Sequence, residues 1–121
     1  VKVPELHNKY MKIYTQERLK YRNLLEERKK LKRFKTDYYS GDLNNPEDLK
    51  YYNIEPYQKH LTKNKVEQYV DSDSDVIKIN EKIYIIEEKL SYLESVIKSI
   101  NNRQWHIRNA IEFMKFKNGG Y

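Results

Sequence analysis

Between Val76 and Met114 an apolar residue recurs every three or four positions, and only Gln104 interrupts the series. An α-helix has 3.6 residues per turn, so this spacing places a narrow apolar stripe along one face of a long helix and favours supercoiling with other helices. Burying each apolar side chain is worth about 1.5–3 kcal/mol, which a lone helix in water cannot obtain. The stripe therefore predicts a homo-oligomer assembled through Ile79, Ile83, Ile86, Leu90, Leu93, Ile97, Ile100, Ile107 and Ile111.

Length and composition point to one helical domain over residues 1–121. Charged residues make up 35% of the chain and apolar residues 38%, which suits an all-α fold of long helices that each bury one stripe. The absence of cysteine excludes disulfides, thiol nucleophiles and cysteine metal sites. No apolar run approaches the roughly 20 residues of a membrane span, and no signal-peptide pattern opens the chain. We expect a soluble, intracellular protein with no membrane partner, and Val1 at the first position suggests a trimmed start.

Basic residues are concentrated at the beginning of the chain. Residues 1–35 hold twelve Lys and Arg against four Glu, whereas residues 36–75 hold four Lys against nine Asp and Glu. Clustered positive charge is typical of a protein that binds a polyanion. Solvated, lysine-rich helices have the same composition, so charge alone leaves both interpretations open.

The sequence pattern predicts four segments. A basic helix spans 5–39 and ends at Gly41, an acidic, tyrosine-rich linker spans 42–56, a short helix spans 57–70, and the oligomerisation helix spans 73–118. Gly119-Gly120 is the expected stop of the last helix. Asn101-Asn102 is a candidate break in that helix, but the apolar phase continues across it and favours one continuous helix.

The acidic run from Asp71 to Asp75 resembles the start of a calcium-binding loop. Such a loop needs Gly at its sixth position and Glu at its twelfth, where this chain has Val76 and Lys82. Ser72 or Asp73 is instead expected to cap the final helix. The three histidines are far apart, and no nucleophile, base and oxyanion donor come together in sequence. We therefore expect no metal, no cofactor and no enzymatic activity.

The strongest candidate for function is the basic run from Arg28 to Lys35. Lysine and arginine neutralise phosphates, and aromatic rings offer surfaces on which unpaired bases stack. Tyr38 continues the apolar stripe of this helix and is assigned to packing, whereas Tyr39 lies one turn after Lys35 and is assigned to stacking. Binding to an acidic protein or an anionic membrane, or no specific partner, remain as alternatives. The predicted DNA-binding residues are Arg28, Lys29, Lys32, Arg33, Lys35 and Tyr39.

Three segments in this order resemble the UvsY family of phage recombination mediators. They are Pro4-Glu-Leu-His-Asn-Lys-Tyr10, the basic helix running into Asp37-Tyr-Tyr-Ser-Gly41, and Asn102-Arg-Gln-Trp-His-Ile-Arg-Asn-Ala-Ile-Glu-Phe-Met-Lys-Phe116. Asp73-Ser-Asp-Val-Ile-Lys-Ile79 also looks like the family pattern. The family usually has a further N-terminal stretch before the first of these segments.

The resemblance implies a ring-like homo-oligomer of six or seven copies that binds single-stranded DNA. It also implies that the protein helps to load a RecA-like recombinase in place of the single-strand-binding protein, in phage recombination, replication and repair in the host cell cytoplasm. The family's DNA-contacting basic pair matches Arg33 and Lys35. The alternative is a coiled-coil scaffold or virion-assembly protein whose basic helix binds another protein.

Overall fold

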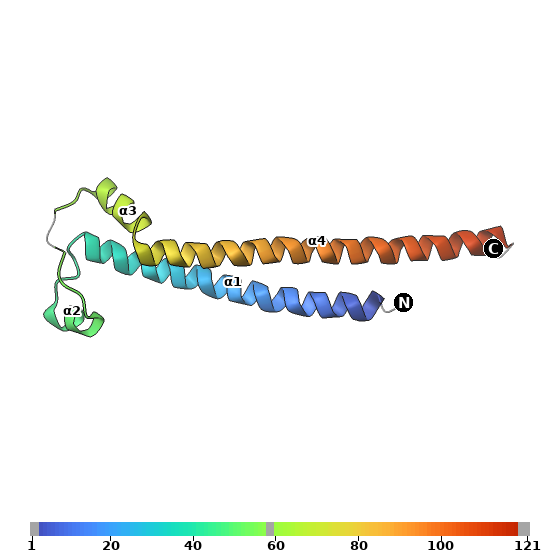
Figure 1. Cartoon of the computed structure of the whole chain (residues 1–121), viewed down its shortest axis with the longest axis horizontal. Helices are drawn as coiled ribbons and strands as arrows, with labels where there is room; N and C mark the ends of the chain where they lie inside the picture. Colours follow the sequence, from blue (N-terminus) through green and yellow to red (C-terminus); the bar gives the residue numbers. More distant parts are fainter. Residues whose placement is uncertain (1–2, 58–59, 119–121) are drawn as a thin grey trace. The chain divides into compact units, whose positions relative to one another are not determined.

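The computed structural model describes residues 3–57 and 60–118 and is all-helical in this part of the chain. The helices are α1 (Val3–Tyr39), α2 (Pro46–Tyr52), α3 (Lys63–Asp71) and α4 (Ser74–Lys117), as Figure 1 shows. The all-α fold class predicted from the sequence is therefore confirmed. Residue contacts divide the chain into two compact units, one of residues 1–20 with 86–121 and the other of residues 21–85.

The unit of residues 21–85 has its core where the end of α1 meets α3 and the beginning of α4. Val66, Val70 and Val76 form the buried cluster, and Val76 has no exposed surface. The partly buried side chains that pack on this cluster are Leu31, Tyr39 and Leu61. Ile79 and Ile83 on α4 are also buried. The first part of the α4 stripe is thus covered within a single chain.

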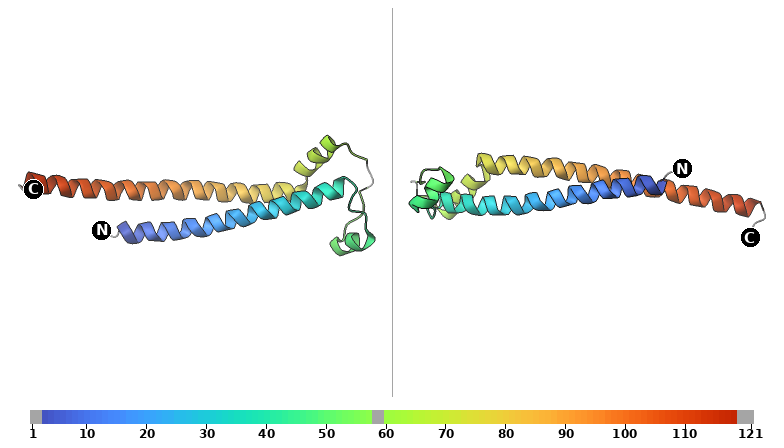
Figure 2. Two further views of the ribbon diagram at one scale, coloured as in Figure 1. Left: turned by 180° about the vertical axis from the view of Figure 1, so that it is seen from behind. Right: turned by 90° about the horizontal axis from the view of Figure 1, so that it is seen from below.

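The unit of residues 1–20 and 86–121 pairs the beginning of α1 with the later part of α4, and the two lie side by side in both views of Figure 2. The Tyr14 hydroxyl donates to Oε1 of Glu94 at 2.7 Å. Leu90, Leu93 and Ile100 are buried. Past the start of α1, α4 continues alone among the described residues, and every side chain on it from 105 to 117 except Asn109 is exposed.

α1 ends at a glycine, as the sequence predicts. The Gly41 φ angle of +83° lies in the left-handed region that glycine adopts without strain. The amide of Gly41 donates to the Tyr38 carbonyl at 3.2 Å, and the amide of Asp42 donates to the Asp37 carbonyl at 3.0 Å. These two hydrogen bonds form a Schellman motif, which satisfies carbonyls at the end of the helix.

The segment 42–56, predicted to be a linker, contains the helix α2. The Asn45 side chain accepts a hydrogen bond from the Glu47 amide at 3.0 Å, and Pro46 occupies the first helical position. Asn53 ends the helix in the left-handed conformation with φ of 54°. Asn-Pro suits a turn and a helix start equally well, so the sequence pattern alone did not identify α2.

α3 is shorter than the predicted helix of 57–70, and residues 58–59 of that prediction lie outside the described residues. Thr62 sets the start of α3, because its side chain accepts a hydrogen bond from the Lys65 amide at 3.4 Å. Asp73 caps α4, since its Oδ1 accepts from the Asp75 amide at 2.9 Å, as expected. α4 passes through Asn101-Asn102 without a break. The expected stop at Gly119-Gly120 lies outside the described residues.

Candidate nucleic-acid interface

Three of the five predicted DNA-binding cations already contact polar side chains of the same unit. Nη1 of Arg28 donates to Oδ1 of Asn80 at 3.1 Å. Nζ of Lys32 lies 3.7 Å from a carboxylate oxygen of Asp71, in a pair that is largely exposed and therefore weak. Lys35 is the most constrained of the three, because it is largely buried between two carboxylates.

Lys35 joins α1 to the beginning of α4. Its Nζ lies 3.2 Å from Oδ2 of Asp73 and 2.9 Å from Oδ2 of Asp75. Burial by itself would lower the pKa of the Lys35 ammonium, but the hydrogen bonds to Asp75 and Asp73 outweigh it and raise the pKa above its ordinary value. This cation is therefore neutralised by the protein itself, although the resemblance described above implies a DNA contact at this position.

Tyr39 also faces Asp73 and is a packing residue. Its hydroxyl donates to Oδ2 of Asp73 at 2.7 Å, and its ring packs against the buried valines of α3 and α4. Its ring centroid lies 5.2 Å from that of Tyr38 and 5.0 Å from that of Tyr57. Burial, followed by the hydrogen bond to Asp73, raises the Tyr39 pKa. This placement corrects the assignment of Tyr39 to the outer surface, while Tyr38 packs as predicted, against Tyr57.

Tyr39 packs inside the unit, and does not face solvent as predicted, because of the junction between α3 and α4. The sequence correctly placed Lys35 and Tyr39 on one side of α1, since both contact Asp73. It could not show that this side faces the junction and not solvent. Burial raises the pKa of the Asp73 carboxyl, but hydrogen bonds from Tyr39, the Asp75 amide and Lys35 outweigh it and leave the pKa below its ordinary value.

Within the basic run from Arg28 to Lys35, the exposed cations are Lys29, Lys30 and Arg33. Lys29 and Arg33 are one helical turn apart, and Lys30 is adjacent to Lys29. Among the described residues none of the three forms an ion pair. We call these three residues the α1 cationic surface. Lys30 was not among the predicted site residues, although its place in the same basic run was a sufficient signal.

A group of three aromatic rings, none of them among the predicted site residues, lies beside this surface. The ring centroid of Tyr52 on α2 lies 4.6 Å from that of Phe34 on α1, and Tyr51 packs edge-on against Tyr52 at 5.0 Å. Tyr51 is 82% exposed. Identifying α2 in the sequence would have been necessary to bring these rings together with α1.

The predicted oligomerisation residues fall into two groups. Ile79, Ile83, Leu90, Leu93 and Ile100 are buried in the single chain, and Ile86 and Ile97 are partly buried. Their burial requires no second copy.

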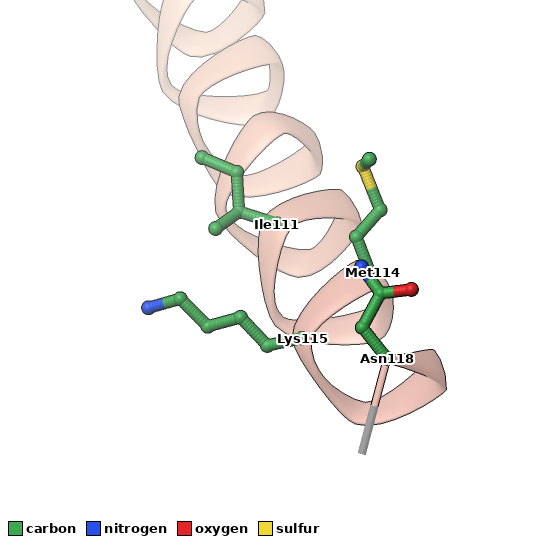
Figure 3. A pocket seen from close by; sticks show the side chains of 4 residues that line it. All are labelled: Ile111, Met114, Lys115 and Asn118. Carbon is green, nitrogen blue, oxygen red and sulfur yellow. The ribbon is translucent and has the colours of Figure 1, made fainter. Parts of the chain in front are cut away.

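The other two residues of that set, Ile107 and Ile111, are exposed on the end of α4. Ile111 lines a shallow depression of about 450 Å³ with Met114, Lys115 and Asn118, and Figure 3 shows these side chains on the last turns of α4 and on the residue that follows it. The stripe is therefore left uncovered there among the described residues.

Two further observations concern metal and membrane binding. In the ranges 3–57 and 60–118 there is no group of three or more His, Asp and Glu residues that could hold a metal ion. Within the same ranges no helix is both long and apolar enough to cross a membrane.

Comparison with protein families gives a match that covers almost the whole chain. The family model described as "Recombination, repair and ssDNA binding protein UvsY" matches residues 1–120. Neither the curated proteins nor the solved structures compared with this sequence gave a match. A family match of this extent agrees with the segments that resemble UvsY in the sequence, and the chain therefore belongs to the UvsY family of recombination, repair and single-stranded-DNA-binding proteins.

Proposed function

We propose that this protein is a recombination mediator that binds single-stranded DNA on the α1 cationic surface and helps a RecA-like recombinase replace the single-strand-binding protein. Membership of the UvsY family supports a role in recombination and repair and the binding of single-stranded DNA. The location of the DNA site is supported by the exposure of Lys29, Lys30 and Arg33, whereas Lys35 in the same run is already neutralised by Asp73 and Asp75. Each exposed cation that meets a phosphate releases counterions, which favours binding.

This proposal separates the two basic positions that match the family's DNA-contacting pair. Arg33 is exposed and is assigned to phosphate contact. Lys35 is assigned to holding α1 against the start of α4, because two carboxylates surround it. The protein thus acts by binding and without catalysis, with Lys35 fixing the helix that presents Arg33.

The proposed homo-oligomer forms through the uncovered end of α4. Ile107, Ile111 and Met114 continue the stripe whose earlier members are buried within the chain, and each is at least 44% exposed. A second copy that covers them would bury apolar surface and repeat the α1 cationic surface around an assembly. The family resemblance gives six or seven copies in a ring. Repeated modest sites bind a long strand tightly, because each further contact is effectively intramolecular.

We expect the protein to bind oligo-dT at least tenfold more tightly than a duplex of equal length, and to accelerate recombinase filament formation on a strand coated with single-strand-binding protein. Fluorescence anisotropy measures the first result, and the rate of filament assembly measures the second. Lys29→Ala with Arg33→Ala should lose both effects. Lys78→Ala with Lys82→Ala removes the same charge from exposed positions of α4 and is the matched control.

Two results would contradict the proposal. Equal affinity for single-stranded and duplex DNA would favour a scaffold protein whose basic helix binds another protein. Tight oligo-dT binding with no effect on recombinase assembly would confine the function to strand protection.

A further inference from the structure

α2 presents two tyrosine rings to solvent at its C-terminal end. Tyr51 is 82% exposed and Tyr52 is 49% exposed. The two rings pack edge to face with centroids 5.0 Å apart, and Tyr52 also contacts Phe34 on α1. Tyr52 is in contact with two neighbouring rings, whereas most of Tyr51 is left exposed by the described residues.

These rings lie beside the α1 cationic surface. Phe34, which Tyr52 contacts at 4.6 Å between centroids, is adjacent to Arg33 and lies one helical turn after Lys30. Sites for single-stranded nucleic acid combine cations that follow the backbone with aromatic faces on which bases stack. α1 and α2 bring these two components together within the unit of residues 21–85.

Charges on α2 give the bound strand an orientation. Glu47 and Asp48 lie in the first turn of α2, one turn before Tyr51 and Tyr52. Their carboxylates repel phosphates, so the backbone of a strand is favoured on α1 and not on α2. The same carboxylates accept hydrogen bonds from exocyclic amino groups of bases. For a strand bound here, these charges favour bases that point from α1 toward α2.

We propose that Tyr51, supported by Tyr52, is a stacking platform for an unpaired base of a strand whose phosphates lie on Lys29, Lys30 and Arg33. This inference rests on the proposed function, because it requires single-stranded DNA on the α1 cationic surface. It also gives that surface a means of selecting single strands. The base pairs of a duplex are stacked on one another, so their faces do not reach Tyr51.

The test compares Tyr51→Ala with Tyr51→Phe on two strands of equal length, oligo-dT and a strand of abasic sites. Tyr51→Ala should weaken oligo-dT binding by about 5- to 150-fold, the range expected for the loss of one base–aromatic stack. Tyr51→Phe keeps the ring and should bind as the wild type does. On the abasic strand all three proteins should bind equally. Tyr92→Ala removes an exposed tyrosine from α4 and is the matched control.

The outcomes separate this inference from the proposed function. One outcome is that Tyr51→Ala leaves the affinity for both strands unchanged, while the double variant Lys29→Ala with Arg33→Ala lowers it for both. The proposal of a stacking platform is then wrong, and the α1 cationic surface remains the DNA site. If Tyr51→Ala lowers the affinity for both strands equally, Tyr51 acts through something other than base stacking and the inference is overturned. If Lys29→Ala with Arg33→Ala leaves the affinity for both strands unchanged, the α1 cationic surface is not the DNA site.

Discussion

Ile83→Asp is expected to unfold the protein, whereas Ile111→Asp is expected to keep its helices and lose its assembly. Ile83 is 2% exposed and belongs to the unit of residues 21–85. The substitution removes about 1.5–3 kcal/mol of apolar burial and also desolvates a carboxylate, so the total loss should exceed about 4 kcal/mol. Ile111 is 50% exposed, so a carboxylate there remains hydrated in a single chain.

Circular dichroism during urea unfolding and native mass spectrometry, at one protein concentration, measure the two results. Ile77→Asp changes an exposed apolar residue of α4 outside the stripe and is the control for both. If Ile83→Asp kept wild-type stability, the stripe would not be buried in its own chain. If Ile111→Asp kept the wild-type mass, the copies would associate through another surface.

Asp73→Ala is the second substitution with a large expected effect. Asp73 caps α4, accepts a hydrogen bond from the Tyr39 hydroxyl and pairs with Lys35. Loss of an N-cap costs about 1 kcal/mol, and a buried hydroxyl left without a partner costs about 1–3 kcal/mol. We expect a loss of about 2–4 kcal/mol in the free energy of unfolding. Asp75→Ala breaks only the more exposed ion pair of Lys35 and should cost less than about 1 kcal/mol.

The pH dependence of unfolding distinguishes this network from packing alone. The Asp73 pKa is lowered from its ordinary 3.8, so its contribution is present above that pH and is lost as the pH falls through the folded value. The pKa values of Tyr39 and Lys35 are raised from 10.0 and 10.5. The folded state then keeps protons that the unfolded state releases, and stability falls as the pH rises above about 10.

The free energy of unfolding should fall less steeply in Asp73→Ala than in the wild type, both toward acid pH and toward alkaline pH. Urea midpoints measured from acid to alkaline pH give this comparison directly. Identical pH profiles for the two proteins would mean that Asp73, Tyr39 and Lys35 do not form a coupled network.

Local sequence signals predicted the helices well, because each signal depends on neighbours along the chain. The three- and four-residue spacing predicted α4, Gly41 predicted the end of α1, and Asp73 predicted the start of α4. The partner of the α4 stripe was not predictable in the same way. α1 carries a cation, Arg28, on the side that faces α4, where Arg28 donates a hydrogen bond to the polar side chain of Asn80.

The sequence predicted which basic residues form the candidate site, but it did not predict which of them are exposed in the fold. Lys29 and Arg33 are exposed, as expected for cations that meet phosphates. Lys35 and Tyr39 are engaged by Asp73, a residue 38 and 34 positions further along the chain, so no pattern within α1 could reveal it. Sequence spacing identifies which residues share a face of a helix, and only the packing shows what that face contacts.

The salt dependence of oligo-dT binding tests the central claim most directly. Each phosphate contact contributes about 0.7 to the slope of log affinity against log salt concentration for a single strand, so Lys29→Ala with Arg33→Ala should reduce the slope by about 1.4 per protomer. The control Lys78→Ala with Lys82→Ala should keep the wild-type slope. A slope that the α1 double variant leaves unchanged, in a protein that is still folded and still binds oligo-dT, would contradict the account and place the strand on another surface.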